Sequence, residues 1–159
     1  MKPDKVFRLA AAVLVCELAG VVGSFFAMAA ISTWYASLNK PWFAPPNWLF
    51  GPAWVALYAM MGAALYIVWE RAGRSKRGFV PLMAFVVQLA LNTLWSILFF
   101  GLRSPAAAFA EIVVLWAAIA YTILKFKEID KRAAYLLLPY IVWVSFAAVL
   151  NYYVWILNA

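Results

Sequence analysis

The sequence has no histidine, one cysteine and few charged residues. Without histidine the chain lacks the commonest metal ligand, the commonest general base and the usual proximal haem ligand, so zinc sites and hydrolase triads are effectively excluded. Cys16 lies inside an apolar run and has no second cysteine to pair with, so we expect a small core residue. We therefore expect neither a bound metal nor a cofactor.

The chain has few charged residues and many apolar ones. Charged residues make up 12% of the chain and apolar residues 69%, whereas a soluble domain has about 25% and about 45–50%. Such a chain cannot cover itself with polar surface in water, so its solvent must be lipid. The net charge of +7 comes from basic clusters between apolar runs and not from a basic stripe, which argues against nucleic acid as a partner.

Five apolar runs are each long enough to cross about 30 Å of hydrocarbon, which takes about 20 helical residues. They predict an all-α fold, a five-transmembrane-helix bundle in which residues 1–159 form a single domain. The expected helices cover about residues 6–31, 52–69, 79–100, 105–124 and 134–157, with a long loop over residues 32–51. Ser104 is placed to cap the fourth helix, and Pro139 predicts a kink inside the fifth.

The basic residues predict the orientation of the bundle. Eleven of the 13 lysines and arginines fall in the segments on one side of the predicted spans, and two, Lys40 and Arg103, fall on the other. The positive-inside rule then places the amino terminus in the cytoplasm and the carboxy terminus outside. The eleven are Lys2, Lys5, Arg8, Arg71, Arg74, Lys76, Arg77, Lys125, Lys127, Lys131 and Arg132.

The loop between the first two spans is long and aromatic. Its residues 34–50 contain six aromatic side chains and three prolines, Pro41, Pro45 and Pro46, which forbid continuous helix and stiffen the backbone. We interpret the loop as a semi-rigid lid over the outer mouth of the bundle. The alternative is an interfacial belt, in which tryptophan and tyrosine sit at headgroup level.

Polar and indole side chains inside the spans lie on shared helix faces. Gln88, Asn92 and Ser96 are four residues apart and so face one way, with Trp95 beside them. Under the predicted orientation, side chains from three spans converge in the outer half of the membrane, beneath the lid: Trp54, Asn92, Trp95 and Asn151. This convergence predicts a ligand pocket, in which Ala147 leaves room for a flat ring next to Trp143. The alternative is that the amides only join helices.

Two carboxyl groups fall within spans. Glu17 and Glu111 are functional candidates because an ionised carboxylate in hydrocarbon is costly, although no basic residue within a span is available to pair with either. The first span also carries small residues at four-residue intervals, which predict close packing against a helix of this chain or of a second copy. They are Ala12, Cys16, Gly20 and Ser24.

Four motifs occur in order along the chain. They are Trp34-Tyr35-x-x-Leu38-x-Lys40-Pro41-x-x-x-Pro45-Pro46, Pro52-x-Trp54-x-x-Leu57-Tyr58-x-x-Met61-Gly62, Gln88-Leu89-x-Leu91-Asn92-x-x-Trp95-x-x-x-Phe99-Phe100-Gly101 and Pro139-Tyr140-x-x-Trp143-x-x-Phe146-Ala147-x-x-Leu150-Asn151-Tyr152-Tyr153-x-Trp155. With these motifs the chain resembles the translocator protein family, also called the tryptophan-rich sensory protein, peripheral benzodiazepine receptor or TspO/MBR family.

The resemblance implies a five-helix bundle, often a homodimer, that binds porphyrins, sterols in some members and isoquinoline carboxamide drugs. Some bacterial relatives are reported to degrade protoporphyrin IX in light, with tryptophans implicated that match Trp54 and Trp143, which makes these two the candidate catalytic residues. The ligand-binding positions carried over by motif are Tyr35, Trp54, Asn92, Trp95, Trp143, Ala147 and Asn151.

The chain departs from the family pattern at two places. Phe43 stands where the family usually has tryptophan in the first loop, with Trp42 just before it, so contacts of the lid are expected to differ. No lysine or arginine follows Tyr152 and Tyr153, although the cholesterol-associated stretch of animal members needs one, which argues against sterol binding.

These observations predict a multi-pass protein of a bacterial or archaeal inner membrane that binds a tetrapyrrole and senses or regulates porphyrin metabolism. Two alternatives stay open. One is light-dependent breakdown of bound protoporphyrin IX, and the other is a small-molecule transporter or exchanger that uses Glu17 and Glu111.

Overall fold

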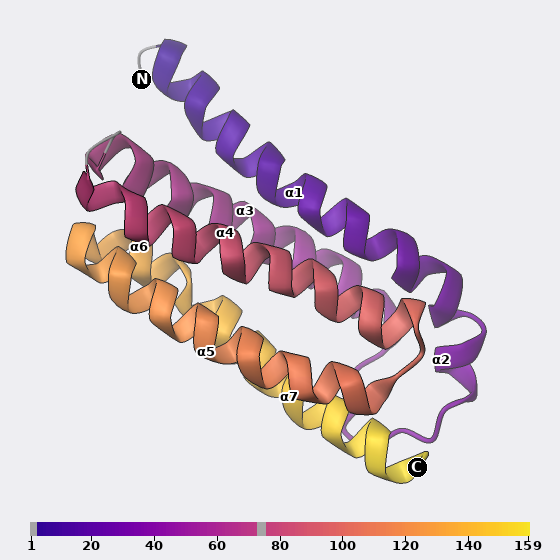
Figure 1. The fold of residues 1–159 in the computed structure, drawn as a ribbon. Helices are drawn as coiled ribbons and strands as arrows, with labels where there is room; N and C mark the ends of the chain where they lie inside the picture. The colour runs from indigo at the N-terminus through magenta and orange to yellow at the C-terminus, as the bar shows by residue number, and fades with distance from the viewer. Residues whose placement is uncertain (1–2, 73–75) are drawn as a thin grey trace.

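The computed structural model describes residues 3–72 and 76–159, which form helices and contain no strand (Figure 1). Lys2 and Arg74, which the charge count includes, lie outside the described residues. The helices are α1 (Pro3–Ile31), α2 (Trp34–Ser37), α3 (Asn47–Ala72), α4 (Lys76–Ser96), the π-helical turn η1 (Ile97–Gly101), α5 (Pro105–Ile129), α6 (Lys131–Leu136) and α7 (Leu138–Leu157).

Five helical stretches of the described chain are long and apolar enough to cross a membrane: α1, α3, α4 with η1, α5, and α6 with α7. This confirms the predicted all-α membrane bundle. Helix α1 packs on α3 and α4, α5 packs on α4 and α7, and α6 packs on α3. Figure 1 shows α2 and the C terminus at one end of the bundle, here called the lid end, and the N terminus at the other.

Helix α3 begins at Asn47, five residues before the predicted start, so Gly51 and Pro52 lie inside its first turns. A proline there removes only one backbone hydrogen bond, the one that would reach the carbonyl of Trp48, and the helix tolerates the loss. Helix α5 continues past the predicted end at residue 124 to Ile129, because the charged residues that follow are good helix formers.

Local side-chain chemistry explains the other boundaries. The hydroxyl of Ser104 accepts a hydrogen bond from the backbone N–H of Ala107, which confirms the predicted cap of α5. The carboxylate of Asp130 accepts from the N–H of Arg132 and starts α6. The last span then breaks at Leu137, so that Pro139 falls in the first turn of α7, where its missing N–H costs little.

The small residues of α1 pack mainly against α3 of the same chain. Ala12 and Cys16 are buried, and a Cβ atom added to Gly20 would overlap the ring of Tyr58. Helix α3 contributes its own glycine to this contact, because a Cβ on Gly62 would overlap the backbone of Val13. Ser24, the last residue of the series, is exposed and leaves the helix contact.

Candidate functional site

The lid, residues 32–51, packs on the bundle through aromatic side chains. Tyr35 is buried, and its ring centroid lies 6.1 Å from that of Phe99 and 6.4 Å from that of Phe50. Phe43 packs edge-on against Phe146 and Tyr153 of α7, at 6.3 and 5.4 Å. Two lid tryptophans are exposed instead, as an interfacial belt requires: Trp42 and Trp48.

A pair of asparagines fastens the lid to the end of α7. The backbone N–H of Asn39 donates to Oδ1 of Asn158 at 2.9 Å, and Nδ2 of Asn158 donates to the carbonyl of Asn39 at 2.9 Å. The side chain of Asn39 also donates to the carbonyl of Leu157 at 3.4 Å. Opening the lid at this point therefore breaks reciprocal bonds between two distant parts of the chain.

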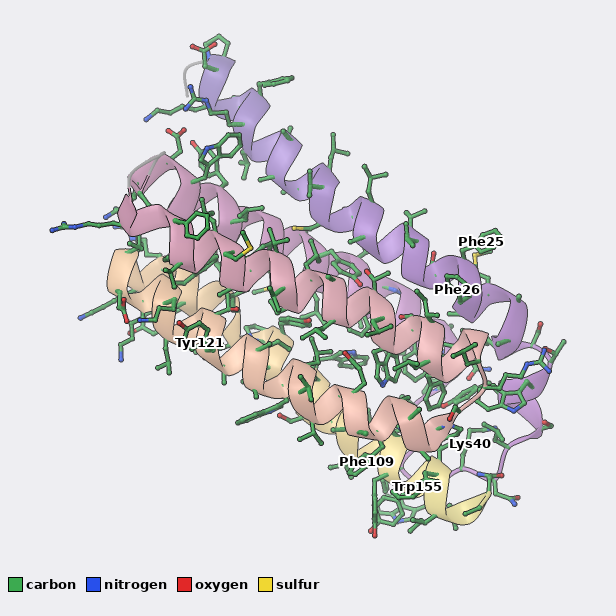
Figure 2. All side chains as sticks on the ribbon, in the orientation of Figure 1. Phe25, Phe26, Lys40, Phe109, Tyr121 and Trp155 are labelled. Atoms are coloured by element: carbon green, nitrogen blue, oxygen red, sulfur yellow. The ribbon has the colours of Figure 1, made fainter. Side chains whose placement is uncertain are left out.

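Lys40 stabilises the lid by binding backbone carbonyls of the same segment. Its ammonium group donates to the carbonyls of Tyr35 at 2.8 Å and Leu38 at 3.0 Å, and it lies 4.9 Å from the centre of the Tyr35 ring (Figure 2). Charged hydrogen bonds of this kind contribute about 1.5–3 kcal/mol each where water is excluded, and less here because the residue is only partly buried. Lys40 thus binds carbonyls at the end of α2, where that of Tyr35 also accepts the N–H of Leu38 at 3.4 Å.

Replacing Lys40 with methionine is expected to loosen the lid while leaving the bundle folded. The methionine keeps the apolar stem but frees the three carbonyls that the ammonium group binds, so local opening becomes easier by about 1–2 kcal/mol. Hydrogen exchange of lid amides in nanodiscs should rise at least fivefold, with Lys127→Met as the control on the far end. Unchanged exchange would contradict this role.

The lid covers a small cavity, here called the lid chamber, of about 30 Å³. Four of the seven predicted ligand-binding residues line it: Tyr35, Trp95, Ala147 and Asn151. Its other walls are Phe50, Phe99, Phe100 and Leu150. The structure therefore brings together residues from the lid, α3, α4, η1 and α7 at the lid end.

Hydrogen bonds orient the polar groups of the lid chamber. Nε1 of Trp95 donates to Oδ1 of Asn151 at 3.0 Å, and Nδ2 of Asn151 donates to the carbonyl of Pro105 at 2.8 Å. The hydroxyl of Tyr35 is buried and has no partner among the described residues. Burial raises the pKa of Tyr35, so its hydroxyl stays protonated and able to donate a hydrogen bond.

Asn92 lies in a buried polar cluster and not in the wall of the lid chamber. Its amide oxygen accepts from the hydroxyl of Tyr58, and its amide nitrogen donates to the hydroxyl of Tyr140 at 3.0 Å. The three side chains come from α3, α4 and α7. Asn92 therefore joins three spans, as the helix-joining alternative describes.

Trp54 lines a second cavity, here called the lateral slot, of about 260 Å³ between α1 and α3. Its rim includes the exposed side chains of Val21, Met28 and Val55, so the slot opens on the flank of the bundle. Phe50 and Phe100 line both the slot and the lid chamber. These two rings therefore form the partition between the two cavities.

Trp143 lies behind this partition. Its ring packs against Phe50 at 6.2 Å and against Phe146 at 5.8 Å, and it lines a groove on the outer side of α3 and α7 together with Ala53 and Val142. The two tryptophans predicted to act together, Trp54 and Trp143, thus line different cavities.

Residues 12–156 match the TspO/MBR family. The chain belongs to this family. A tryptophan-rich protein TspO of Archaeoglobus fulgidus is 45% identical to it over 154 residues, 97% of this chain and 99% of the relative. The translocator protein of Ovis aries is 41% identical over 143 residues, 89% and 85% of the two chains. A tryptophan-rich sensory protein of Cereibacter sphaeroides is 40% identical over 119 residues, 75% and 73%.

In this multi-pass membrane protein of the TspO/MBR family, several residues that line the cavities were not predicted from the sequence. Phe50, Phe99 and Phe100 line the cavities although only the last two stand in a quoted motif, and none was singled out. Tyr58 and Tyr140 stand in two of the quoted motifs, but the sequence does not identify them as the partners of Asn92.

The two intramembrane carboxyl groups of this TspO/MBR chain have different surroundings. Glu111 is buried in α5, and neither of its oxygens has a hydrogen-bond partner among the described residues. Glu17 is half-buried on α1 and lines the lateral slot. The structure does not bring the two together at one cavity.

Proposed function

We propose that this chain is a membrane-embedded tetrapyrrole-binding protein that senses or regulates porphyrin metabolism. The observation that carries the proposal is the pair of aromatic cavities at the lid end, which share Phe50 and Phe100 in their linings. A planar macrocycle suits such walls because ring stacking contributes about 0.5–1.5 kcal/mol per aromatic pair beyond the burial of apolar area. The names of the relatives, sensory protein and translocator protein, are consistent with a ligand-responsive role.

Cavity size indicates how a tetrapyrrole would be accommodated. The lid chamber of about 30 Å³ holds about one water molecule, whereas drug-sized ligands occupy pockets of about 300–1,000 Å³. The lateral slot adds about 260 Å³ once the partition moves aside. We infer that binding changes the rotamers of Phe50 and Phe100 and joins the two cavities.

The same movement would bring the predicted ligand-binding residues other than Asn92 to one macrocycle. Trp95 already stacks on Phe99 at 5.1 Å, and Trp54 stacks on Tyr58 at 5.5 Å, so both indoles present flat faces. Trp143 would become a wall of the joined cavity when Phe50 leaves it. The unpartnered hydroxyl of Tyr35 is available to a polar substituent of the ring.

We propose further that the lid end faces the outside and the opposite end the cytoplasm of a bacterial or archaeal cell. The support is the charge pattern, with eleven of the 13 lysines and arginines in the segments away from the lid end. A homodimeric assembly and binding of isoquinoline carboxamide drugs remain predictions that the family resemblance supports.

Titration of protoporphyrin IX into nanodiscs, followed by tryptophan quenching, tests the binding proposal. The double variant Trp95→Ala, Trp143→Ala is expected to lose at least tenfold in affinity, because it removes two stacking faces of the joined cavity and 1.4 kcal/mol corresponds to a factor of ten. Empty nanodiscs correct for partition of the porphyrin into lipid.

The matched control is Trp155→Ala, which removes an indole from the outer side of α5 and α7. Trp155 packs against Phe109 at 5.8 Å and does not line the lid chamber or the slot (Figure 2). Its affinity should match that of the wild type. Equal affinity of the double variant and the control would refute the proposed pocket.

A further inference from the structure

Glu17 occupies the middle of α1 and lines the lateral slot. Fourteen residues separate it from either end of the helix, which is about 21 Å at 1.5 Å per residue. It therefore lies near the centre of a bilayer that α1 crosses. From Glu17 the slot follows α1 toward Ile31 and so runs from this depth to the lid end.

The slot has small residues on part of one wall and flat rings on the other. Half of the lining residues on α1 are small: Gly20, Gly23, Ser24 and Ala27. The larger side chains on this helix are Glu17, Val21, Met28 and Ile31. The facing wall on α3 carries the stacked rings of Trp54 and Tyr58. The inner edge is closed, because a Cβ on Gly20 would overlap Tyr58. Small residues opposite flat rings suit a planar body, which can stack on the indole.

The carboxyl group of Glu17 has no counterpart in the slot. Glu17 is the one acidic residue of the slot lining, and no lysine or arginine belongs to that lining. No hydrogen bond or ion pair joins Glu17 to another residue in the ranges 3–72 and 76–159.

Three hydroxyl groups line the slot: that of Ser96 lies against Gly23, and the other two already have partners. Ser24 donates to the carbonyl of Val21 at 2.8 Å, and Tyr58 donates to Asn92. A carboxyl group in apolar surroundings gains most from a cation or a strong hydrogen-bond donor. The described chain places neither of these on Glu17, so a ligand could supply the complementary group.

We propose that the lateral slot binds flat, hydrophobic amines, with Glu17 as their counter-ion. The ring system lies between the small-residue face of α1 and the indole of Trp54, and the basic nitrogen meets the carboxyl group at the deep end of the slot. A hydrogen bond joins nitrogen and oxygen whichever of the two carries the proton, and it is a charged one when the proton is on the nitrogen. The exposed rim of the slot admits such a ligand from the lipid.

Amine binding at this site is a function beyond the proposed tetrapyrrole binding and does not depend on it. A porphyrin brings carboxylates of its own, which Glu17 repels, so the two ligand classes differ in the charge that they place at this depth. Failure of the porphyrin titration would leave amine binding untouched, and failure of amine binding would leave the stacking residues of the lid chamber untouched.

The test compares two planar probes of similar shape, cationic 9-aminoacridine and neutral anthracene. Tryptophan quenching is measured in nanodiscs of phosphatidylcholine, which carries no net charge to concentrate the cation, with empty nanodiscs as the partition control. The wild type is expected to bind 9-aminoacridine at least tenfold more tightly than anthracene. Glu17→Gln should lose this preference and keep its affinity for anthracene.

Glu111→Gln is the matched control, because Glu111 is the other intramembrane carboxyl residue and does not line the slot. It should retain the wild-type preference. Ala27→Phe fills the slot without touching the carboxyl group and should weaken both probes, which gives a second readout should Glu17→Gln fail to fold. Equal wild-type affinity for the two probes, or equal loss of both in a folded Glu17→Gln, overturns the proposal.

Discussion

Replacing Asn92 with leucine is expected to lower the free energy of unfolding by about 2–4 kcal/mol, because it leaves two buried hydroxyl groups without partners. The hydroxyls belong to Tyr58 and Tyr140, and both side chains are buried. A single interhelical hydrogen bond in a membrane protein averages only about 0.6 kcal/mol. The expected loss is larger here because one substitution orphans groups on two other helices at once.

Thermal unfolding in a mild detergent measures this loss, with Thr93→Val as the control on the next residue. The hydroxyl of Thr93 reaches the carbonyls of Leu89 at 3.3 Å and Ala19 at 3.5 Å, so its bonds are long and its removal should cost less than about 1 kcal/mol. Adding Tyr58→Phe and Tyr140→Phe to the Asn92→Leu variant removes the orphaned hydroxyls. That triple variant should regain at least half of the lost stability, and a further decrease would contradict the assignment.

Helical periodicity predicts which side of a span a residue faces, but not which neighbour covers it. Trp95, Ala147 and Asn151 were predicted to meet because their spacing puts them on inward faces at one depth, and they do line one cavity. Trp143 shares the stripe of Ala147 on α7, yet Phe50 lies against its ring. The position of Phe50 depends on α3 beginning at Asn47, which the three prolines just before it do not reveal.

The π-helical turn is the second feature that sequence patterns do not predict. The backbone N–H of Leu102 donates to the carbonyl of Ile97 at 2.8 Å, five residues back, which inserts one residue into the helical repeat. The insertion changes the direction of the residues that follow. Phe99 packs against Trp34 of the lid at 5.6 Å, while Phe100 lines the lateral slot, and no residue type in this segment signals the change.

The sequence predicts that a second helix packs closely on α1, but it does not predict which helix this is. The small residues of α1 predict close approach of a second helix, and either another span or a second copy satisfies that pattern. The structure places α3 there, with Gly62 against the backbone of Val13. Gly62 stands in a quoted motif, so its importance follows from the sequence only once the facing helix is known.

Gly62→Ala is therefore expected to lower the free energy of unfolding by about 2–3 kcal/mol, near the upper end for overpacked sites. The added Cβ would meet the Cα and N atoms of Val13, and neither can move without shifting the whole of α1. Alanine gains about 1 kcal/mol in helix propensity over glycine, which reduces the loss but does not reverse it. A flexible side chain could move away from the added Cβ atom, whereas the backbone of Val13 cannot.

Gly51→Ala, in the same helix, separates the steric effect from propensity. A Cβ at Gly51 has nothing within 4 Å, so this variant should be neutral or more stable by up to about 1 kcal/mol. Because Gly51 lines the lateral slot at its lid end, the comparison uses thermal unfolding without added ligand. If Gly62→Ala unfolds at the same temperature as Gly51→Ala, α1 does not depend on this contact, and the close packing of α1 on α3 contributes little to the stability of the bundle.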